Sequence, residues 1–565
     1  MNKRLYFPFL MVALAVFFAA CSSNLKPLSG NYIKAEPQPL ELVAGKVPVT
    51  INATFPAKWF NKKATVTVIP VLRYEGGEAW GTSYTFQGEK VAGNGQVIPQ
   101  KAGANVVMKS AFDYVPAMQS SQLYLTFTAK IGKKTVALPD IMIAEGVLAT
   151  AALLDAGSEG PAIAPDKFQR VIKEAHDANI LFLIQRAELR SSELQKGALS
   201  DWKDIIKEAD QASNQNVDIE ISSYASPDGG YSLNEKLAER REENTKSYLS
   251  RELKKNKVNA PVNARYTAQD WDGFKQLVEK SNIQDKDLIL RVLSMYNDSE
   301  QREREIKNLS SVFEVLADEV LPQLRRSRLT ANVEIIGKSD EEIASLASSA
   351  PATLNIEELL YAATLTNTQS QKETIYKDVI KYFSNDARGY NNLGVIEYTK
   401  GNIAEAEAQF NKANQVAGSL PEANLNLGFA ALTKGDKAKA EEYFGKAAGT
   451  DQLSSAQGLL AVLNGNYSQA VQSFGSTQSN NAALAQILTK DYNKAQSTLN
   501  AIANPDATTS YLKAIVGART NNLDAVVSNL KQAVTLKPAL ASKALQDIEF
   551  AKYVANKAFL DAVVK

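Results

Sequence analysis

The sequence predicts a multidomain protein with an N-terminal β-sandwich-like region, a central α/β sandwich with a helical insertion, and a C-terminal all-α superhelix of repeats. Three observations predict this order. Residues 31–150 alternate apolar and polar side chains, residues 160–340 mix strand and helix periods, and residues 355–565 repeat small and aromatic residues at an interval of 34. At roughly 150 residues per domain, a chain of 565 residues has room for about three or four domains.

The composition excludes several classes of function. The chain has 63 Lys and Arg against 62 Asp and Glu, so it lacks the basic excess typical of nucleic-acid binding, and we predict no nucleic-acid partner. His176 and Cys21 are the only residues of their kinds, which excludes intrachain disulfides, Cys/His zinc sites and any Ser-His-Asp triad not built on His176. We predict no metal, no cofactor and no enzymatic activity, and we expect His176 to be solvated, just before the first central strand.

An enzyme with paired carboxylates, either carbohydrate-active or wall-processing, is the alternative to a non-enzymatic protein. Most acidic residues cluster with Lys and Arg in helical stretches, which is typical of solvated helix faces. Gly-rich phosphate loops of the Walker or dinucleotide type are absent from the sequence. The pattern therefore favours a non-enzymatic protein.

The N-terminus has the features of a cleaved signal peptide. Lys3 and Arg4 form a basic head, and the apolar residues 5–20 follow it. Such a run is too short to span a bilayer comfortably and ends in small residues, so we predict a signal peptide over residues 1–20 and a linker over residues 21–30.

Cys21 follows Ala19 and Ala20, and this arrangement resembles the lipobox of bacterial lipoproteins, although Phe18 stands where Leu is usual. The resemblance implies that the Cys21 thiol is acylated, with palmitate among the chains, and that lipid anchors the protein in a membrane. An ordinary signal peptide with an incidental Cys21 is the alternative. Because residues 22–26 lack the acidic cluster of surface-export signals, we expect the periplasmic face of the outer membrane.

The pattern of residues 31–150 predicts β structure. Alternation is visible at residues 64–69 and 123–128, and Gly-containing turns such as residues 75–77 and 92–95 separate such runs. Either two short β-sandwich modules or one long one fits this pattern.

Residues 160–340 alternate strands and helices, which predicts an α/β sandwich. We expect a buried strand at residues 179–184 and a charged helical insertion at about residues 270–325. The remaining predicted elements are a helix at 202–212, a strand at 217–221, a helix at 233–253, and strands at 262–266 and 329–336.

The string from Ile219 to Arg241 resembles the core motif of the OmpA-like peptidoglycan-associating domain, through a strand, a Gly-containing loop, Asn234 and the arginine pair. The resemblance implies an Asp in the loop and an Arg fifteen residues later that hold the ammonium and carboxylate of diaminopimelate. The Arg falls on Arg241, but the Asp position is Ser226, and Asp228 two residues on is the substitute. Arg241, Ser226, Asp228 and Asn234 are thus candidate peptidoglycan-binding residues, and a scaffold arginine paired with Glu242 or Glu243 is the alternative for Arg241.

The C-terminal repeat predicts a solenoid. The set Leu393, Gly394, Gly401, Ala406 and Phe410 recurs 34 residues later as Leu427, Gly428, Gly435, Ala440 and Phe444. This spacing resembles the tetratricopeptide repeat (TPR), with glycines where paired helices cross and phenylalanines between neighbours. A contracted copy begins near Gly458, degenerate copies follow, and we expect an opening helix pair at residues 357–383 to cap the array.

Such solenoids present a concave groove to peptides or partner proteins. The first helices carry Asn391, Asn392, Asn424 and Asn426, and amides can hydrogen-bond an extended backbone without selecting charge. A spacer that packs against the chain's own central domain is the alternative interpretation of the repeats.

Taken together, the motifs predict a non-enzymatic envelope lipoprotein whose TPR groove recruits a protein partner in envelope assembly or secretion. The competing hypothesis is a cell-wall anchor that binds peptidoglycan through its OmpA-like domain. The partner's identity and the oligomeric state are open at this point.

Overall fold

The computed structural model describes residues 25–564 except Glu159 and Leu309. The predicted signal peptide and Cys21 lie outside the described residues. The chain forms two compact units: the first combines Met1–Ala164 with Phe383–Lys565, and the second, here called the inserted unit, is Pro165–Tyr382. No helix among the described residues is long and apolar enough to cross a bilayer.

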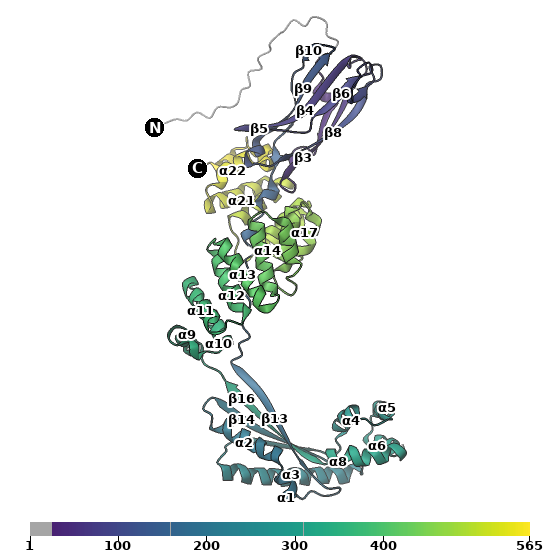
Figure 1. Cartoon of the computed structure of the whole chain (residues 1–565), viewed down its shortest axis with the longest axis vertical. Helices are drawn as coiled ribbons and strands as arrows, with labels where there is room; N and C mark the ends of the chain where they lie inside the picture. The colour runs from purple at the N-terminus through teal and green to yellow at the C-terminus, as the bar shows by residue number, and fades with distance from the viewer. Residues whose placement is uncertain (1–24, 159, 309, 565) are drawn as a thin grey trace. The chain divides into compact units, whose positions relative to one another are not determined.

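The N-terminal part of the first unit is a β sandwich (Figure 1). One sheet has the order β1-β3-β8, and the other has the order β10-β9-β4-β6-β7, with β11 on β9 and β5 on β4. The strands are β1 (Ile33–Glu36), β2 (Leu40–Glu41), β3 (Lys46–Phe55), β4 (Ala64–Tyr74), β5 (Gly77–Trp80), β6 (Tyr84–Gly88), β7 (Gln96–Ile98), β8 (Ala104–Asp113), β9 (Gln122–Ile131), β10 (Lys134–Ala137), β11 (Ile141–Glu145) and β12 (Val147–Leu148).

The predicted sheet-rich N-terminal region is confirmed, and it is one sandwich rather than two. The alternating apolar residues of both sheets, including Ile51 of β3 and Val66 of β4, join a single buried cluster. The short strands β2 and β12 pair in parallel beside it.

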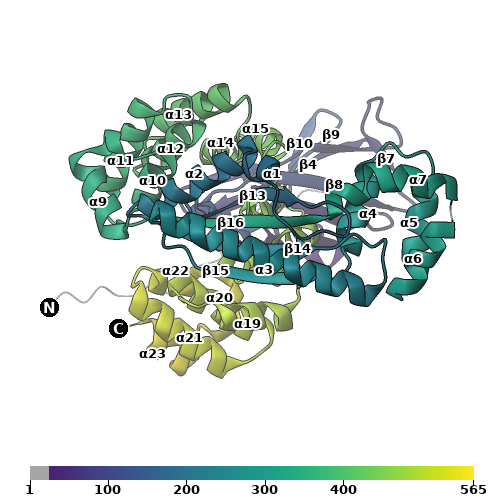
Figure 2. The same ribbon diagram turned by 90° about the horizontal axis from the view of Figure 1, so that it is seen from below.

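The inserted unit contains a four-stranded sheet of order β13-β16-β14-β15, in which β14 and β15 are parallel and the other pairs antiparallel. Two helices, α2 and α3, cover one face of this sheet (Figure 2). The elements are β13 (Val171–Leu181), α1 (Ser191–Leu194), α2 (Gly197–Gln211), β14 (Gln215–Tyr224), α3 (Tyr231–Asn256), β15 (Val262–Thr267) and β16 (Arg326–Ile336).

Further helices complete the inserted unit. Between β15 and β16 lie α4 (Trp271–Lys280), α5 (Lys286–Met295), α6 (Ser299–Asn308), α7 (Ser310–Glu319) and α8 (Leu321–Leu324), which enclose an apolar cluster of their own. After β16 come α9 (Asp340–Ser349), α10 (Ile356–Ala362) and α11 (Gln369–Tyr382). The helix pair that we expected to cap the repeats thus forms α10 and α11, which belong to the inserted unit.

The first strand of the inserted unit differs from the prediction. It begins at Val171 rather than at residue 179, and it ends at Leu181, so His176 lies inside the strand opposite Ala331. The expected buried run to residue 184 is wrong because Leu183 and Ile184 are exposed in the following loop. β13 is an edge strand, and its first half is solvent-exposed. Its sequence there lacks the continuous apolar run that predicts a buried strand, so the prediction missed this part of the strand.

The C-terminal part of the first unit is the predicted all-helical array, which Figure 1 shows from green to yellow. Five helix pairs follow one another, and each second helix packs on the first of its pair. The pairs are α12 (Ala387–Thr399) with α13 (Ile403–Ala417), α14 (Pro421–Thr433) with α15 (Lys437–Phe444), α16 (Leu453–Leu463) with α17 (Tyr467–Phe474), α18 (Asn480–Leu488) with α19 (Tyr492–Ala501), and α20 (Ala507–Arg519) with α21 (Leu523–Leu536). Two short helices, α22 (Leu540–Gln546) and α23 (Lys557–Val563), end the chain.

Glycines sit where the two helices of a repeat cross. A Cβ atom on Gly394 would lie 2.6 Å from Phe410 Cε1, and one on Gly428 would lie 2.3 Å from Phe444 Cε1. Real Cβ contacts do not reach such distances, so each ring occupies the space that glycine leaves. Leu393 and Leu427 are buried beside these crossings, and Ala406 and Ala440 are fully buried on the second helices.

The turn within each pair needs one residue with positive φ. Gly401 (φ 84°), Gly435 (φ 78°) and Gly465 (φ 76°) provide it in the first three repeats, because glycine adopts this conformation without strain. Lys490 (φ 66°) and Asn521 (φ 59°) occupy the same place in the fourth and fifth repeats. The degenerate repeats therefore keep the turn although they lose its glycine.

Candidate functional site

A segment of the chain itself lies along the first helices of the repeats. We call residues 155–164 the strap; it connects the β sandwich to the inserted unit in the sequence, and Glu159 is not described. Its residues bond to α18 at one end and to α14 and α12 at the other, so the strap runs opposite to the order of the repeats. Three of the four asparagines that the sequence predicts to bind a backbone do so here, and that backbone belongs to the same chain.

Two asparagines each hold both backbone groups of one strap residue. Asn426 accepts a hydrogen bond from the Ala162 N–H (2.7 Å) and donates one to the Ala162 carbonyl (2.8 Å). Asn392 does the same for Ala164, at 2.8 and 2.9 Å. A side-chain amide offers one acceptor and one donor group side by side, so it pairs with a backbone residue as a neighbouring strand would.

Asn391 joins the two asparagines into one network. Its amide nitrogen donates to the Ala162 carbonyl and to Asn392 Oδ1, and its Oδ1 accepts from Asn426 Nδ2, each over 3.0 Å. All three asparagines are buried, so the polar atoms are compensated by one another and by the strap. Asn424, predicted for the same row, instead bonds within the array to Asn414, Ser419 and Leu420.

A third asparagine of this kind was missed by the sequence analysis. Asn481 on α18 accepts from the Asp155 N–H (3.0 Å) and donates to the Asp155 carbonyl (2.8 Å). Asn392, Asn426 and Asn481 each stand nine residues before the positive-φ turn residue of their repeat. Aligning the repeats on that turn residue, rather than on the interval of 34, would have found Asn481. The third and fifth repeats carry Ala456 and Leu512 at this position.

The side chains that the strap turns toward the repeats are small. Ala162 and Ala164 are each 2% exposed, whereas Ile163 between them is 43% exposed. Ala162 packs in the apolar cluster that includes Leu425 and Phe429 of α14. The strap has a 3-10 turn at Ala156–Ser158. Beyond it, α12 and α14 contact alternate residues and leave the residue between them in solvent, as for an extended chain, and the surface of α12 and α14 that binds Ala162 and Ala164 is called the groove.

A buried polar cluster ties the β sandwich to the end of the array. Thr150 donates to the Glu549 carboxylate, and Arg519 binds the same carboxylate through Nε (2.6 Å) and Nη2 (2.8 Å). Close by, burial raises the pKa of the Asp547 carboxyl, although a hydrogen bond from the Tyr511 hydroxyl (2.7 Å) acts in the other direction. The cluster is fully partnered within the unit, which favours a structural role.

In the inserted unit, the candidate residue Arg241 is fully buried. Its guanidinium donates to the carbonyls of Arg186 (2.9 Å), Tyr224 (2.8 Å) and Leu183 (3.2 Å), and it stacks over the Phe182 ring. Burial, followed by the nearby positive charge of Arg325, lowers the pKa of Arg241 to about 10. Its partners are backbone carbonyls, not the helix-face glutamates weighed as the alternative.

The other three candidate residues lie together at the start of α3, with Ser226 and Asp228 in the loop before the helix and Asn234 in its first turn. The Ser226 hydroxyl donates to Asp228 Oδ1 over 2.6 Å, and Asn234 donates to the Ser226 and Gly229 carbonyls. Arg325 forms an ion pair with Asp228 at 3.0 Å. The loop thus brings the Asp228 carboxylate to Ser226, and binding of peptidoglycan at this place stays a prediction.

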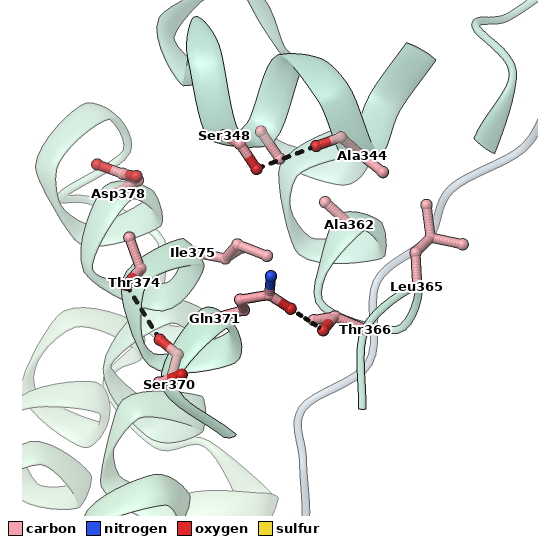
Figure 3. Close-up of a pocket in the computed structure, with 11 residues that line it drawn as sticks. Ala344, Ser348, Ala362, Leu365, Thr366, Ser370, Gln371, Thr374, Ile375 and Asp378 are labelled. Atoms are coloured by element: carbon pink, nitrogen blue, oxygen red, sulfur yellow. Dashed lines mark hydrogen bonds between the residues drawn. The ribbon is translucent and has the colours of Figure 1, made fainter. Parts of the chain in front are cut away.

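The inserted unit also contains a pocket of about 450 Å³, and Figure 3 shows the residues that line it. Small and apolar side chains from α9, α10 and α11, among them Ala344, Ala362 and Ile375, form its walls, and the Gln371 amide points into it. Among the described residues there is no group of three or more His, Cys, Asp and Glu side chains suited to hold a metal ion. His176 is half-buried on its strand, and its Nε2 lies 3.2 Å from Glu174 Oε2.

The comparisons with known proteins concern the repeats. The tetratricopeptide repeat family matches residues 387–419 and 421–452, which contain α12 to α15. Similar solved structures include a tetratricopeptide repeat protein from Parabacteroides merdae (13% identity, 40% of this chain and 91% of that chain, TM-score 0.29) and pilF of Pseudomonas aeruginosa (15%, 39% and 100%, 0.30). Another is YrrB, described as a TPR protein with an unusual peptide-binding site (16%, 36% and 99%, 0.21).

None of the curated proteins matches the chain. The family match agrees with the crossing glycines, the positive-φ turns and the paired helices described above. The C-terminal array of this protein therefore contains tetratricopeptide repeats, which indicate a scaffold for protein–protein interaction.

Proposed function

We propose that this protein is a non-enzymatic scaffold of the Gram-negative cell envelope, held on the periplasmic face of the outer membrane by acylated Cys21, whose repeats bind segments of other proteins. The observation that carries the binding function is the pairing of Asn392 and Asn426 with both backbone groups of Ala164 and Ala162. These amides recognise an extended backbone in the very groove through which solenoid proteins hold peptides. The lipobox-like residues before Cys21 support the membrane anchor.

The anchor is tested by replacing the acylated thiol. A Cys21→Ala chain keeps every described element but has no site for acyl chains, so it should leave the membrane and fractionate as a soluble periplasmic protein. Cys21→Ala that still fractionates with the outer membrane after a high-salt wash contradicts the lipid anchor. A Ser22→Ala chain, altered one residue later, is the matched control and should stay in the membrane.

The scaffold role is tested by affinity capture from detergent-solubilised membranes, with mass spectrometry of the bound proteins. The full chain should capture a defined envelope protein, and an Asn392→Ala, Asn426→Ala double variant should lose it. Asn424→Ala is the control, since Asn424 is a buried asparagine of the same array that bonds within the repeats. Equal capture by all three chains contradicts a role for the groove.

A peptidoglycan anchor is the second candidate function, and the hydrogen bond between Ser226 and Asp228 favours it. This bond holds the Asp228 carboxylate, which also pairs with Arg325, beside Ser226, and Ser226 stands where the OmpA-like resemblance implies a carboxylate for the diaminopimelate ammonium. Purified sacculi should then retain the full chain but not Asp228→Ala. Retention of both chains, or of neither, excludes this candidate site.

A further inference from the structure

The strap has the properties of a ligand that the chain supplies to its own groove. Over α12 and α14, every hydrogen bond described between the repeats and the strap goes to its backbone, at Ala162 and Ala164. No charged side chain takes part in these bonds. Recognition therefore depends on an extended backbone and on the size of two side chains.

The size limit is strict because both side chains are enclosed. Ala162 and Ala164 are buried to the same extent, and Ala162 already touches the packed apolar cluster of α14 and α16. A larger side chain at Ala162 would overpack this cluster, and Ala164 is too enclosed to extend into solvent. The exposed Ile163 carries no such restriction.

The flanking prolines prepare the segment for this conformation. Pro161 and Pro165 enclose Ala162–Ala164, and each proline disfavours the helical conformation of the residue before it. Extended chains with few alternatives lose less conformational entropy when they bind. The sequence of the strap thus suits a groove that binds backbone N–H and carbonyl groups.

We propose that the groove over α12 and α14 binds an extended segment of a second protein with the pattern proline–small–any–small, and that residues 161–164 occupy it as a displaceable internal copy of that segment. This inference rests on the proposed scaffold function and names the class of partner segment. A partner must compete with a tethered ligand at an effective concentration on the order of millimolar, so the strap sets a threshold for binding.

The strap can leave this groove without unfolding the first unit. Its other end is held independently, by the pairing of Asn481 with Asp155 and by the packing of Leu154 beside the apolar clusters of the array. Among the contacts of the described residues, release of Ala162 and Ala164 breaks the bonds to Asn391, Asn392 and Asn426. The β sandwich keeps its own attachment through Thr150 and Glu549.

The experiment weakens the strap and measures binding of a free copy. The probe is a fluorescein-labelled peptide with the sequence of residues 160–166, Gly-Pro-Ala-Ile-Ala-Pro-Asp, titrated against the full chain in detergent and followed by anisotropy. Ala162→Asp places a charge in the enclosed position and should raise the affinity for the peptide at least tenfold over wild type. Ile163→Asp adds the same charge at the exposed position and should bind as weakly as wild type.

Two further measurements assign the binding to the groove. Adding Asn426→Ala to the Ala162→Asp chain should remove the gain in affinity. A peptide with Leu at the position of Ala162 should fail to bind, whereas one with Ser at the position of Ile163 should bind normally. Hydrogen exchange of residues 160–164 reports whether the strap has left the groove, and Ala164→Asp is the second variant if Ala162→Asp does not fold.

Several results would overturn the inference. One is a strap that stays protected from exchange in both Asp variants, and another is a released strap without any gain in peptide affinity. A gain that survives Asn426→Ala places the peptide elsewhere, and dimers of the Ala162→Asp chain in light scattering would make a second copy of this chain the occupant. If the peptide binds as expected but affinity capture from membranes yields no partner, the proposed scaffold function is contradicted and this inference is not. If a partner is captured and the peptide does not displace it, this inference is contradicted and the scaffold function is not.

Discussion

Asparagine is suited to its place on the first helices because its amide is short and rigid. Lys or Arg there would select a charged ligand group, whereas Asn392 and Asn426 bond to groups that every residue but proline carries. Their enclosure strengthens the bonds and makes an unpaired amide costly. The residues were predicted from the sequence, but their ligand was not, since nothing local to these helices specifies the strap.

Arg241 illustrates the same principle in the inserted unit. Arg241→Met keeps an unbranched side chain but removes the guanidinium, which leaves the carbonyls of Leu183, Arg186 and Tyr224 without this donor. Buried acceptors without partners are costly, so we expect a loss of at least about 3 kcal/mol in the free energy of unfolding. Urea unfolding, monitored by hydrogen exchange of the β14 amides, measures this loss in the free energy of unfolding.

The neighbouring residue provides the control for this variant. Arg240 is exposed on the same helix, so Arg240→Met should change the free energy of unfolding by less than about 0.5 kcal/mol. Equal stability of Arg241→Met and Arg240→Met would contradict the structural role of Arg241 and would favour the ligand role that the family resemblance implies.

Asp506 provides a prediction about pH. It caps α20 in a capping box with Thr509. Burial alone would raise the pKa of Asp506, but hydrogen bonds from Thr509 and Asn480 outweigh it and hold the pKa below the usual value of 3.8. Because the folded pKa is lowered, the cap's contribution is present above pH 3.8 and is lost as the pH falls through the folded pKa.

Asp506→Ala should therefore lower the free energy of unfolding by about 1 kcal/mol at pH 7, and the difference from wild type should shrink as the pH falls below 3.8. Denaturant unfolding of both chains at pH 7 and over a series of lower pH values measures the difference in the free energy of unfolding. Asp524→Ala is the control, because Asn522 caps α21 and Asp524 only lies in its first turn. A difference that does not depend on pH would contradict a charged cap.

At the scale of the element, the repeat is a helix crossing held by one glycine and one ring. The interval of 34 residues predicted this for the first two repeats, and the third keeps it although it is shorter: a Cβ atom on Gly458 would lie 2.8 Å from the Phe474 ring. The second helices α15 and α17 have 8 residues each, against 15 in α13, so the second and third repeats are shortened outside the crossing. Contact at the crossing, rather than length, defines the element.

Gly428→Ala tests this contact because helix propensity and the contact with Phe444 should change the free energy of unfolding in opposite directions. Helix propensity alone would make the alanine variant more stable by about 1 kcal/mol. The clash with Phe444 should outweigh this gain, and we expect a net loss of about 1–2 kcal/mol in the thermal or urea unfolding of the chain. Phe444→Leu makes room, so in a double-mutant cycle the two changes together should cost less than their sum. Purely additive costs would contradict the crossing.

At the scale of the whole molecule, the first unit is assembled from two segments that the inserted unit separates in the sequence. Hydrogen bonds between the strap and the repeats join residues 228 and 264 positions apart. The strap, the Thr150–Glu549 bond and the bond from the Tyr467 hydroxyl to the Leu42 carbonyl connect the two segments. A domain order read along the chain does not reveal this arrangement.

The first unit should therefore fold without the inserted unit. Ala164 is bonded to Asn392, which lies less than two helical turns from the start of α12, so about eight Gly/Ser residues in place of residues 165–382 should join the ends. We expect cooperative thermal unfolding and retained exchange protection at Ala162. Aggregation, or loss of that protection in a folded chain, would contradict the assignment of the units.

The sequence by itself determined the sheet-rich N-terminal region, the all-helical array and the residues at its helix crossings. These features follow from local periods of two and of 34 residues, which record which side chains are buried. The tertiary structure alone decided that the first helices of the repeats bond to Asp155, Ala162 and Ala164 of the same chain, that Arg241 bonds to three carbonyls, and that α10 and α11 belong to the inserted unit. The physical reason is that each of these depends on contacts between backbone groups or on distant segments, and backbone groups are the same at every position of a sequence.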